Sequence, residues 1–305
     1  MAHDSNYQLV FDKKQEMSEL TKRQDDDRKL AQLDPPYVMK NLDGQPTPDV
    51  INVTMNEAMV FAGRAAAIMS GANMQRIVYG RELSDTDTTT IEEFYRDIYY
   101  ANDLMLANSL FTSLYGFLIE QILIRGSIAA RCLMRTEGGE NGKFIPDIMP
   151  LDTRYFPYET DSQGLIWGAY ETTRTKAQIE RDYGIVIRGR WSTVTDFWDD
   201  TVNDIYIAKQ HYSGGSQSGI KDSVKYPERK REHGLGYPPL IFMKSGAGFH
   251  SLMDVGGLKF QGESIFNNNR GLIPELHRAA SIMQTLTAMG FEGALYANLE
   301  DPNSG

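Results

Sequence analysis

The segment from Pro150 to Gly184, PLDTRYFPYETDSQGLIWGAYETTRTKAQIERDYG, restricts the fold of this chain more than any other. Its aromatic and β-branched residues predict a strand over 154–159 and a return strand over 165–173. Between them, the sequence Asp161–Gly164 is typical of a tight turn. The segment therefore predicts a hairpin.

A short helix is predicted directly after this hairpin, over 175–183. Thr175 and Gln178 form a capping box, because each side chain can satisfy a free amide at the start of a helix. Gly184 stands where a left-handed residue commonly ends a helix. Rigid packing of strands and a capped helix is predicted, with no catalytic group in the segment.

The part before the hairpin predicts helices. Val53–Met69 is rich in Ala and Met, and a capping box of Thr90 with Glu93 is expected to begin a long helical region. From 102 to 124 the residues are apolar nearly all round, which predicts burial on most sides. Gly126 is expected to end this region.

The middle of the chain predicts further strands. They are expected on both sides of a glycine-rich loop at 138–142, again within 185–212, and as a short buried strand in 237–246.

The end of the chain predicts helix. Residues 264–270 are expected to be helical, followed by a break at Pro274 and a second helix over 275–289. Gly290 is expected to stop it, and the following residues read as the start of a strand that fades into a loop.

The fold class is therefore α+β, in four stretches. Residues 1–50 are interpreted as an N-terminal arm or linker, with a mobile terminus favoured over a docking arm. Residues 51–126 are helical, 127–260 are β-rich, and 261–305 carry the last helix.

Composition limits the classes of function. The chain has 305 residues and a net charge of −10, because acidic side chains outnumber its lysines and arginines. This balance does not favour tight nucleic-acid binding, since affinity for DNA comes mainly from Lys and Arg that neutralise phosphates. Its one cysteine, Cys132, excludes an internal disulfide and a cysteine-based zinc site. No signal peptide is recognised at the N-terminus, and Leu104–Ile124 is interpreted as a core helix rather than a membrane span because polar residues interrupt it.

Catalytic motifs are weak. Gly214 and Gly219 have the glycine spacing of a phosphate-binding loop, but Ile220 stands where lysine is required. Clustered carboxylates can hold Mg²⁺ for phosphoryl chemistry, so an acidic group is a candidate metal site of a phosphodiesterase: Asp196, Asp199, Asp200 and Asp204. A strand with a polar turn is the favoured interpretation. We expect no enzyme, no cofactor and no metal.

A basic stretch offers a candidate contact with DNA phosphates or an acidic partner: Lys225, Arg229, Lys230 and Arg231. An exposed, solvated turn is the favoured interpretation.

The order of these elements resembles the portal proteins, or head-to-tail connectors, of tailed bacteriophages. The helix ending in Arg125-Gly126 is similar to the one that leads into their first wing strand. Residues 152–184 resemble the wing, with the patterns D-x-R-Y-x-x-Y, D-x-x-G and T-x-x-Q-I-x-x-x-Y-G. The stretches 233–246 and 262–298 resemble the later G-x-P-P strand and the G-x-S entry to the helix before the stem and clip.

The resemblance departs from the family at the end of the chain. Portal chains normally continue through a clip, a second stem helix and a crown, which suggests a partial chain. Pro274 also interrupts the position of a long stem helix.

The resemblance implies a structural role. Family members form a ring, generally of twelve, at one capsid vertex of the virion. Double-stranded DNA passes through the ring without tight binding, driven by a separate terminase. Partners would be the major capsid protein, the terminase large subunit and adaptor or tail proteins, with assembly in the host cytoplasm. A channel wall rich in carboxylates would let DNA slide. Another head–tail adaptor or connector, and the metal-dependent phosphodiesterase, remain alternatives.

Overall fold

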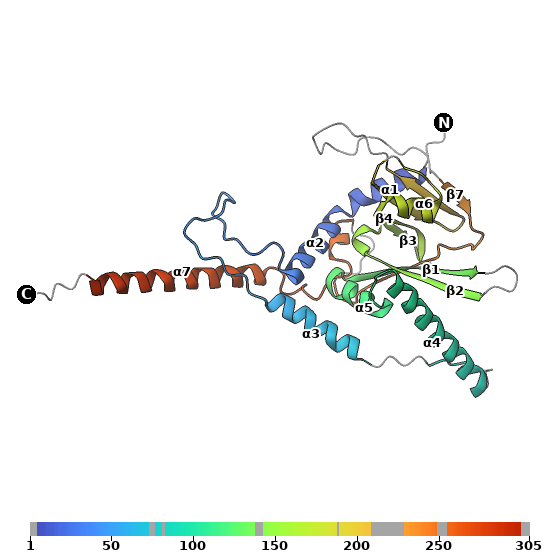
Figure 1. The fold of residues 1–305 in the computed structure, drawn as a ribbon, viewed down its shortest axis with the longest axis horizontal. Helices are drawn as coiled ribbons and strands as arrows, with labels where there is room; N and C mark the ends of the chain where they lie inside the picture. The colour runs from blue at the N-terminus through green and yellow to red at the C-terminus, as the bar shows by residue number, and fades with distance from the viewer. Residues whose placement is uncertain are drawn as a thin grey trace, which may run out of the picture.

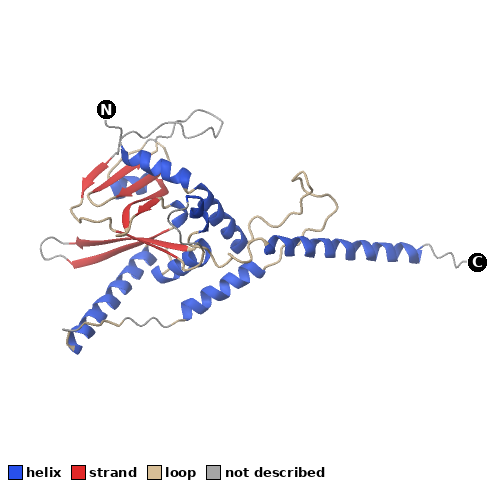
Figure 2. Ribbon diagram, turned by 180° about the vertical axis from the view of Figure 1, so that it is seen from behind, coloured by secondary structure: helices blue, strands red, loops and turns tan. Residues whose placement is uncertain are grey.

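The computed structural model combines antiparallel sheets with helices, which confirms the α+β class (Figures 1 and 2). It describes residues 5–72, 77–80, 83–137, 143–187, 189–208, 229–248 and 255–299. The strands lie together at one end of the molecule, and the last helix extends away from them (Figure 2). The glycine-rich loop expected at 138–142 lies outside the described residues.

A three-stranded sheet has the order β2-β1-β8. Its strands are β1 (Ser127–Glu137), β2 (Lys143–Leu151) and β8 (Leu240–Lys244). The prediction that β8 is a buried strand is wrong, because among the described strands it pairs with β1 alone and because its residues alternate in exposure. Leu240 is buried, whereas Ile241 and Met243 are exposed on the outer face.

A five-stranded sheet has the order β3-β4-β5-β6-β7, with every neighbouring pair antiparallel. Its strands are β3 (Tyr158–Thr160), β4 (Leu165–Thr175), β5 (Trp191–Trp198), β6 (Val202–Ile207) and β7 (Arg229–Glu232).

The predicted hairpin and capped helix are present. β3 and β4 pair across a turn in which Asp161 Oδ1 accepts hydrogen bonds from the amides of Gln163 and Gly164. Helix α6 (Lys176–Tyr183) has the expected capping box of Thr175 and Gln178.

One detail of the hairpin differs from the prediction. A 3-10 turn, η3 (Thr153–Tyr155), replaces the first half of the expected strand over 154–159. Asp152 causes it, because its carboxylate accepts a hydrogen bond from the Arg154 amide and so caps the turn.

The main core lies between the two sheets. One hydrophobic cluster joins Ala129 and Leu240 of the three-stranded sheet to Tyr158 and Trp198 of the five-stranded sheet. Arg131 of β1 adds a polar link, since its guanidinium donates to Asp147 of β2 and Asp196 of β5, both at 3.3 Å.

Residues 5–32 are not a mobile arm, which corrects the sequence interpretation for this part of the stretch 1–50. They form α1 (Ser5–Glu16) and α2 (Ser18–Gln32). α1 covers one face of the five-stranded sheet, where Val10 joins the cluster of Trp167 and Phe197. α2 places Leu20 in the core between the sheets.

The helices that follow are α3 (Glu57–Gly71), α4 (Asp85–Asn108), α5 (Leu114–Glu120) and the π-helical turn η1 (Gln121–Arg125). Gly126 ends η1, as predicted, and it has the left-handed conformation. The start predicted at Thr90 is wrong: Ser84 and Asp87 form the capping box of α4, so the helix begins one and a half turns earlier.

The expectation of burial on most sides over 102–124 is also wrong. The chain leaves the helix after Asn108 and re-enters it at Leu114, with Leu110 left-handed and exposed in between. Leu104 and Phe111 are exposed as well. In the described part of the chain, no helix is long and apolar enough to cross a membrane.

The side chain of Asn102 closes the open edge of β2. Its carboxamide nitrogen donates to the Ile148 carbonyl at 3.1 Å, and its oxygen accepts from the Ile148 amide at 2.8 Å. The fully buried Asn102 thus satisfies both backbone groups of Ile148, which this edge strand would otherwise leave unpaired at that residue.

The last helix differs from the prediction. Residues 265–271 form turns after η4 (Val255–Phe260), and α7 runs from Leu272 to Leu299. Pro274 does not break α7, because it lies in the first turn, where its missing N–H has no helical partner in any case. Nor does Gly290 stop α7, and no strand follows it within the described residues.

Candidate functional site

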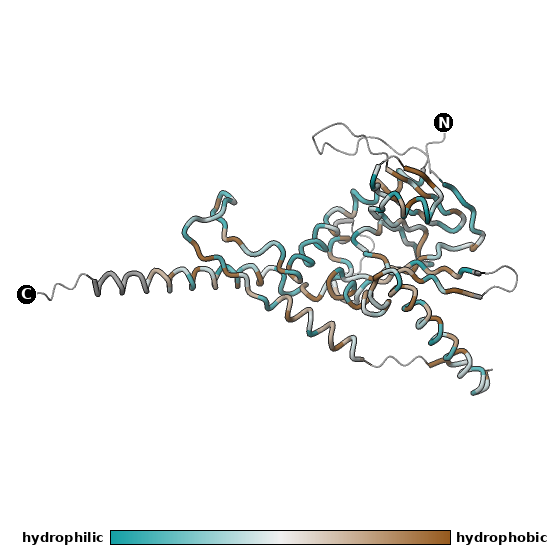
Figure 3. Tube along the Cα trace, viewed as in Figure 1, coloured by the Kyte–Doolittle hydropathy of each residue, from teal (hydrophilic) through white to brown (hydrophobic). Residues whose placement is uncertain are grey.

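Helix α7 projects from the body of the molecule (Figure 1). Hydrophobic residues recur along its described part and along α3 (Figure 3). A row of exposed small or apolar residues, called the α7 seam below, follows alternating steps of four and three: Leu272, Leu276, Ala279, Met283, Leu286 and Gly290. Met283 is 69% exposed and Leu286 is 63% exposed. This spacing is that of a helix which packs lengthwise on another helix.

The opposite face of α7 is occupied by an extended segment of the same chain, residues 50–56, called the strap below. Its amides donate to helix side chains: Ile51 to Thr285 Oγ1, Val53 to Ser281 Oγ and Met55 to His277 Nδ1, at 2.9–3.0 Å. Every second strap residue meets every fourth helix residue. These steps match, since four helical residues rise about 6 Å and two extended residues about 6.6 Å.

The hydroxyls under the strap are fully used. Ser281 donates to the His277 carbonyl and Thr285 donates to the Ser281 carbonyl, both at 2.8 Å, while each accepts from the strap. All three helix residues are buried. The strap therefore gives α7 one satisfied polar face and leaves the α7 seam bare.

His277 links the strap to protonation. Because Nδ1 accepts the Met55 amide, it carries no proton in this arrangement. Burial lowers the pKa of His277, and the nearby Glu57 carboxylate opposes that shift. The ring of Tyr37 lies 5.4 Å from the imidazole, centroid to centroid.

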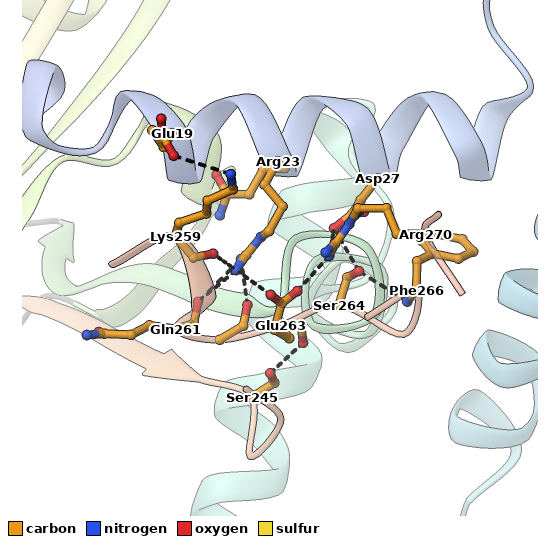
Figure 4. A network of polar contacts seen from close by, with 12 residues as sticks. Glu19, Arg23, Asp27, Ser245, Lys259, Gln261, Glu263, Ser264, Phe266 and Arg270 are labelled. Carbon is orange, nitrogen blue, oxygen red and sulfur yellow. Dashed lines mark hydrogen bonds and ion pairs between the residues drawn. The ribbon is translucent and has the colours of Figure 1, made fainter. Parts of the chain in front are cut away.

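The base of α7 is held by buried charges, called the root cluster below and drawn in Figure 4. Its members come from α2 and from the residues just before α7: Arg23, Asp27, Glu263, Ser264 and Arg270. Asp27 is fully buried and accepts from Arg270 Nε at 2.6 Å, Arg270 Nη2 at 2.9 Å and Ser264 Oγ at 2.8 Å. This two-pronged contact fixes direction as well as distance.

Arg23 extends the root cluster. It contacts Glu263 at 3.3 Å and donates to the carbonyls of Lys259, Gln261 and Gly262, the last at 2.8 Å. Burial lowers the pKa of Arg23, with Glu263 opposing.

Arg270 differs from Arg23 in the balance of its surroundings. Burial acts against its charge, but the hydrogen bonds and charges of Asp27 and Glu263 outweigh it and raise the pKa of Arg270.

Two glycines cross next to the root cluster. Gly126 and Gly262 are both left-handed, with φ of 75° and 59°. A Cβ added to Gly126 would lie 1.8 Å from the Gly262 carbonyl oxygen, which leaves no room for a side chain. The start of β1 and the segment before α7 are thus in direct backbone contact.

A second set of ion pairs ties α2 to η3. Arg125 donates to the Gln24 carbonyl at 2.9 Å and to Asp152 at 3.0 Å, and Arg154 binds Asp25 at 2.8 Å. The sequence marked Arg125 and Asp152 as parts of patterns but gave no partner for either.

The aspartates singled out in the sequence do not converge. Asp196 lies on the face of β5 that looks toward the three-stranded sheet, where Arg131 and Asn203 donate to it. Burial raises the pKa of Asp196, with Arg131 opposing. Asp204 lies on the other face of the sheet, as the register shows, and accepts from Asn6 at 2.9 Å.

The other two lie in the turn between β5 and β6. Asp199 accepts from the amides of Thr201 and Val202, and Asp200 is exposed. Among the described residues, no group of three His, Cys, Asp or Glu side chains is arranged to hold a metal ion. The four carboxylates each have a separate place in the strand–turn–strand, and a shared metal ion would require them to meet.

The basic stretch is a strand rather than the expected turn. Lys225 lies outside the described residues, while Arg229, Lys230 and Arg231 belong to β7 at the edge of the five-stranded sheet. Arg229 lies over the ring of Tyr183, 5.2 Å from its centroid. Lys230 and Arg231 are exposed.

The sequence reasoning missed the root cluster and the strap. One signal was readable: His277, Ser281 and Thr285 recur every four residues in an otherwise apolar helix. Arg23 and Asp27 have the same spacing, but in a strongly charged segment this is also typical of a solvated helix.

Comparison with known proteins identifies no relative: no protein-family model matches the chain, and no curated protein sequence matches it significantly.

Proposed function

We propose that this chain is a structural subunit of a closed ring of the portal kind, with the α7 seam packed against a neighbouring copy. The ring would be the passage for double-stranded DNA at the capsid vertex of a tailed-phage virion. The proposal rests on the order of the wing-like motifs in the sequence and on one observation, the exposed α7 seam.

The α7 seam supports self-association, because its apolar side chains are exposed to water and a partner that covers them would remove this unfavourable exposure. Four large apolar side chains lie exposed along it: Leu272, Leu276, Met283 and Leu286. Small residues, Ala279 and Gly290, alternate with them and would let a second helix approach closely. In a ring, the two contacting faces differ, so the seam need not meet another α7 seam.

The mounting of α7 also supports a mechanical role. The strap and the root cluster hold its base through hydrogen bonds and ion pairs on two sides. A projecting helix held in this way keeps its direction, which a ring of many copies needs in order to close.

The partners implied by a portal are part of the proposal. They are the major capsid protein, the terminase large subunit and adaptor or tail proteins. The exposed Lys230 and Arg231 would serve as contacts with acidic protein surfaces or DNA phosphates. With a net charge of −10, DNA would pass without tight binding. No observation favours the phosphodiesterase alternative, since its aspartates do not meet.

The test is the mass of the native protein, by native mass spectrometry with negative-stain microscopy. A ring of twelve copies of this 34.4 kDa chain would have a mass of about 413 kDa, with a central hole. A ring of different size and shape would favour another connector. A chain that stays monomeric at concentrations of tens of micromolar contradicts the proposal.

A pair of variants tests the surface. Leu286→Glu places a charge on the α7 seam and is expected to abolish the ring, because an unpaired charge would be buried in the contact. Gln284→Glu places the same charge at an exposed position of α7 off the seam and is expected to leave the ring intact. Equal assembly of both variants would exclude the seam as the contact.

A further inference from the structure

A small internal cavity lies next to the root cluster. Its volume is about 10 Å³, and it is lined by residues of α2 and Met17 just before it, the start of β1, η3, β3, β8 and the segment before α7. The lining combines apolar residues, such as Met17, Leu20 and Phe242, with polar ones.

Two buried polar atoms of this lining have no hydrogen-bond partner among the described residues: Gln24 Oε1 and Thr153 Oγ1. Gln24 is 2% exposed and Thr153 is 3% exposed. Their residues are otherwise engaged, since the Gln24 amide group donates to the Arg125 carbonyl and the Thr153 backbone amide donates to Gln121. A buried polar atom without a partner destabilises the fold, so two at one cavity call for an explanation.

Lys244 also lines the cavity. Its ammonium donates to Gln261 Oε1 and lies 5.8 Å from the centre of the Tyr158 ring. An ammonium has three donor hydrogens, so the hydrogen bond to Gln261 leaves capacity for an acceptor within the cavity.

We propose that this cavity is a binding site for one ordered water molecule, which joins α2 to η3. The water donates to Gln24 Oε1 and to Thr153 Oγ1, and its oxygen accepts from Lys244 Nζ. Such a molecule makes three hydrogen bonds, the usual number for a buried water. The volume is close to the ~10–15 Å³ that a single water needs, and it excludes any larger ligand.

The water adds to the contacts that hold α2 against η3 and the segment before α7. Arg125 already links α2 to Asp152 beside η3, and Arg23 links α2 to the segment before α7. The water adds a contact between these two sets of interactions, through Gln24 and Thr153.

The test is whether one substitution raises or lowers the equilibrium constant of unfolding. Thr153→Val keeps the shape of the side chain and removes the hydroxyl. If the site holds water, the unfolding equilibrium constant in urea titration is expected to rise about fivefold, because a hydrogen bond to the water is lost. If the cavity is dry, removing an unpartnered hydroxyl leaves that constant unchanged or lowers it, and the proposal is overturned.

Thr47→Val is the matched control. Thr47 Oγ1 is also buried and unpartnered among the described residues, but it does not line the cavity. The control is expected to leave the unfolding constant unchanged or lower it. If the unfolding constant of Thr47→Val rises as much as that of Thr153→Val, the water site is contradicted, because losing any such hydroxyl would then destabilise the fold.

A direct measurement completes the test. Water-¹⁷O relaxation dispersion of the full chain is expected to show one long-lived internal water fewer in Thr153→Val than in the wild type. An unchanged number of long-lived waters, or an empty cavity in a high-resolution electron-density map of the wild type, would contradict the proposal.

Discussion

The helices α2 and α7 have opposite compositions and opposite surroundings. Eight of the fifteen residues of α2 are charged, yet Arg23, Gln24 and Asp27 are buried. Only three of the twenty-eight residues of α7 are charged, yet the α7 seam is exposed. Burial in this molecule follows the presence of a partner rather than hydropathy: α2 has partners for its charges, and within the described part of the chain α7 has none for its apolar face.

The two helices also contribute to different equilibria: α2 to the folding of the monomer and the α7 seam to its association. The charges of α2 are held by specific geometry, so removing one member leaves the others unpaired in a medium that solvates them poorly. The exposed residues of the α7 seam contribute little to the folded monomer and are free to contribute to assembly. Substitutions in the root cluster and at Gly126 should therefore lower the free energy of unfolding. Substitutions on the α7 seam should change only the association of the chain.

The largest effect is expected at the backbone contact between Gly126 and Gly262. Gly126→Ala should lower the free energy of unfolding by about 4 kcal/mol or more, because its Cβ would overlap the Gly262 carbonyl. Gly184→Ala is the control: Gly184 is also left-handed but has open space, so about 1–2 kcal/mol is expected. Urea unfolding measures both, and equal losses would show that only backbone conformation matters at Gly126.

The root cluster gives the next largest effect. Asp27→Asn keeps the shape but removes the charge that Arg270 and Arg23 face, and we expect a loss of about 3–5 kcal/mol in the free energy of unfolding. Asp26→Asn, one residue earlier and paired only with Lys29 at the surface, should cost less than about 0.5 kcal/mol. Similar losses at the two positions would mean that burial does not distinguish them.

Acid should loosen the strap on α7. The pKa of His277 is lowered in the folded chain, so the unfolded chain binds a proton first as pH falls, and stability decreases below pH ~6.5. The loss should reach about 1 kcal/mol, the value of the hydrogen bond from Met55. His277→Gln should remove this part of the pH dependence between pH 7 and 5. An identical pH profile in the variant would refute the role of His277.

The smallest effect is expected on the α7 seam. Leu286→Glu should change the free energy of unfolding of the monomer, measured at nanomolar concentration, by less than about 0.5 kcal/mol, because the side chain is 63% exposed. A loss above 2 kcal/mol would show that Leu286 is covered within its own chain and would remove the contrast with Asp27.

Local signals in the sequence predicted local structure well. The capping box of Thr175 and Gln178, the turn at Asp161 and the left-handed Gly184 are all present, because each depends on atoms within a few residues. The prediction that Thr90 begins α4 failed, because Ser84 and Asp87 form a capping box further upstream and Thr90 lies inside the helix.

Burial was the property that sequence predicted least well. The polar segment 5–32 was expected to be mobile, and the apolar segment 102–124 was expected to be enclosed; both expectations were wrong. The described side chains that donate hydrogen bonds to Asp27 are those of Ser264 and Arg270, which lie 237 and 243 residues away. No pattern within α2 identifies such partners.

The sequence by itself therefore determined the α+β class, the hairpin, the cap of α6 and the apolar spacing of α7, since these depend on short-range periodicity and on the chemistry of neighbouring residues. Only the tertiary structure decided that one face of α2 is buried, that four aspartates lie apart and that the strap covers one face of α7. The physical reason is that these properties arise from contacts between segments distant along the chain, and a buried charge is stable only where the fold brings its partner within hydrogen-bonding distance.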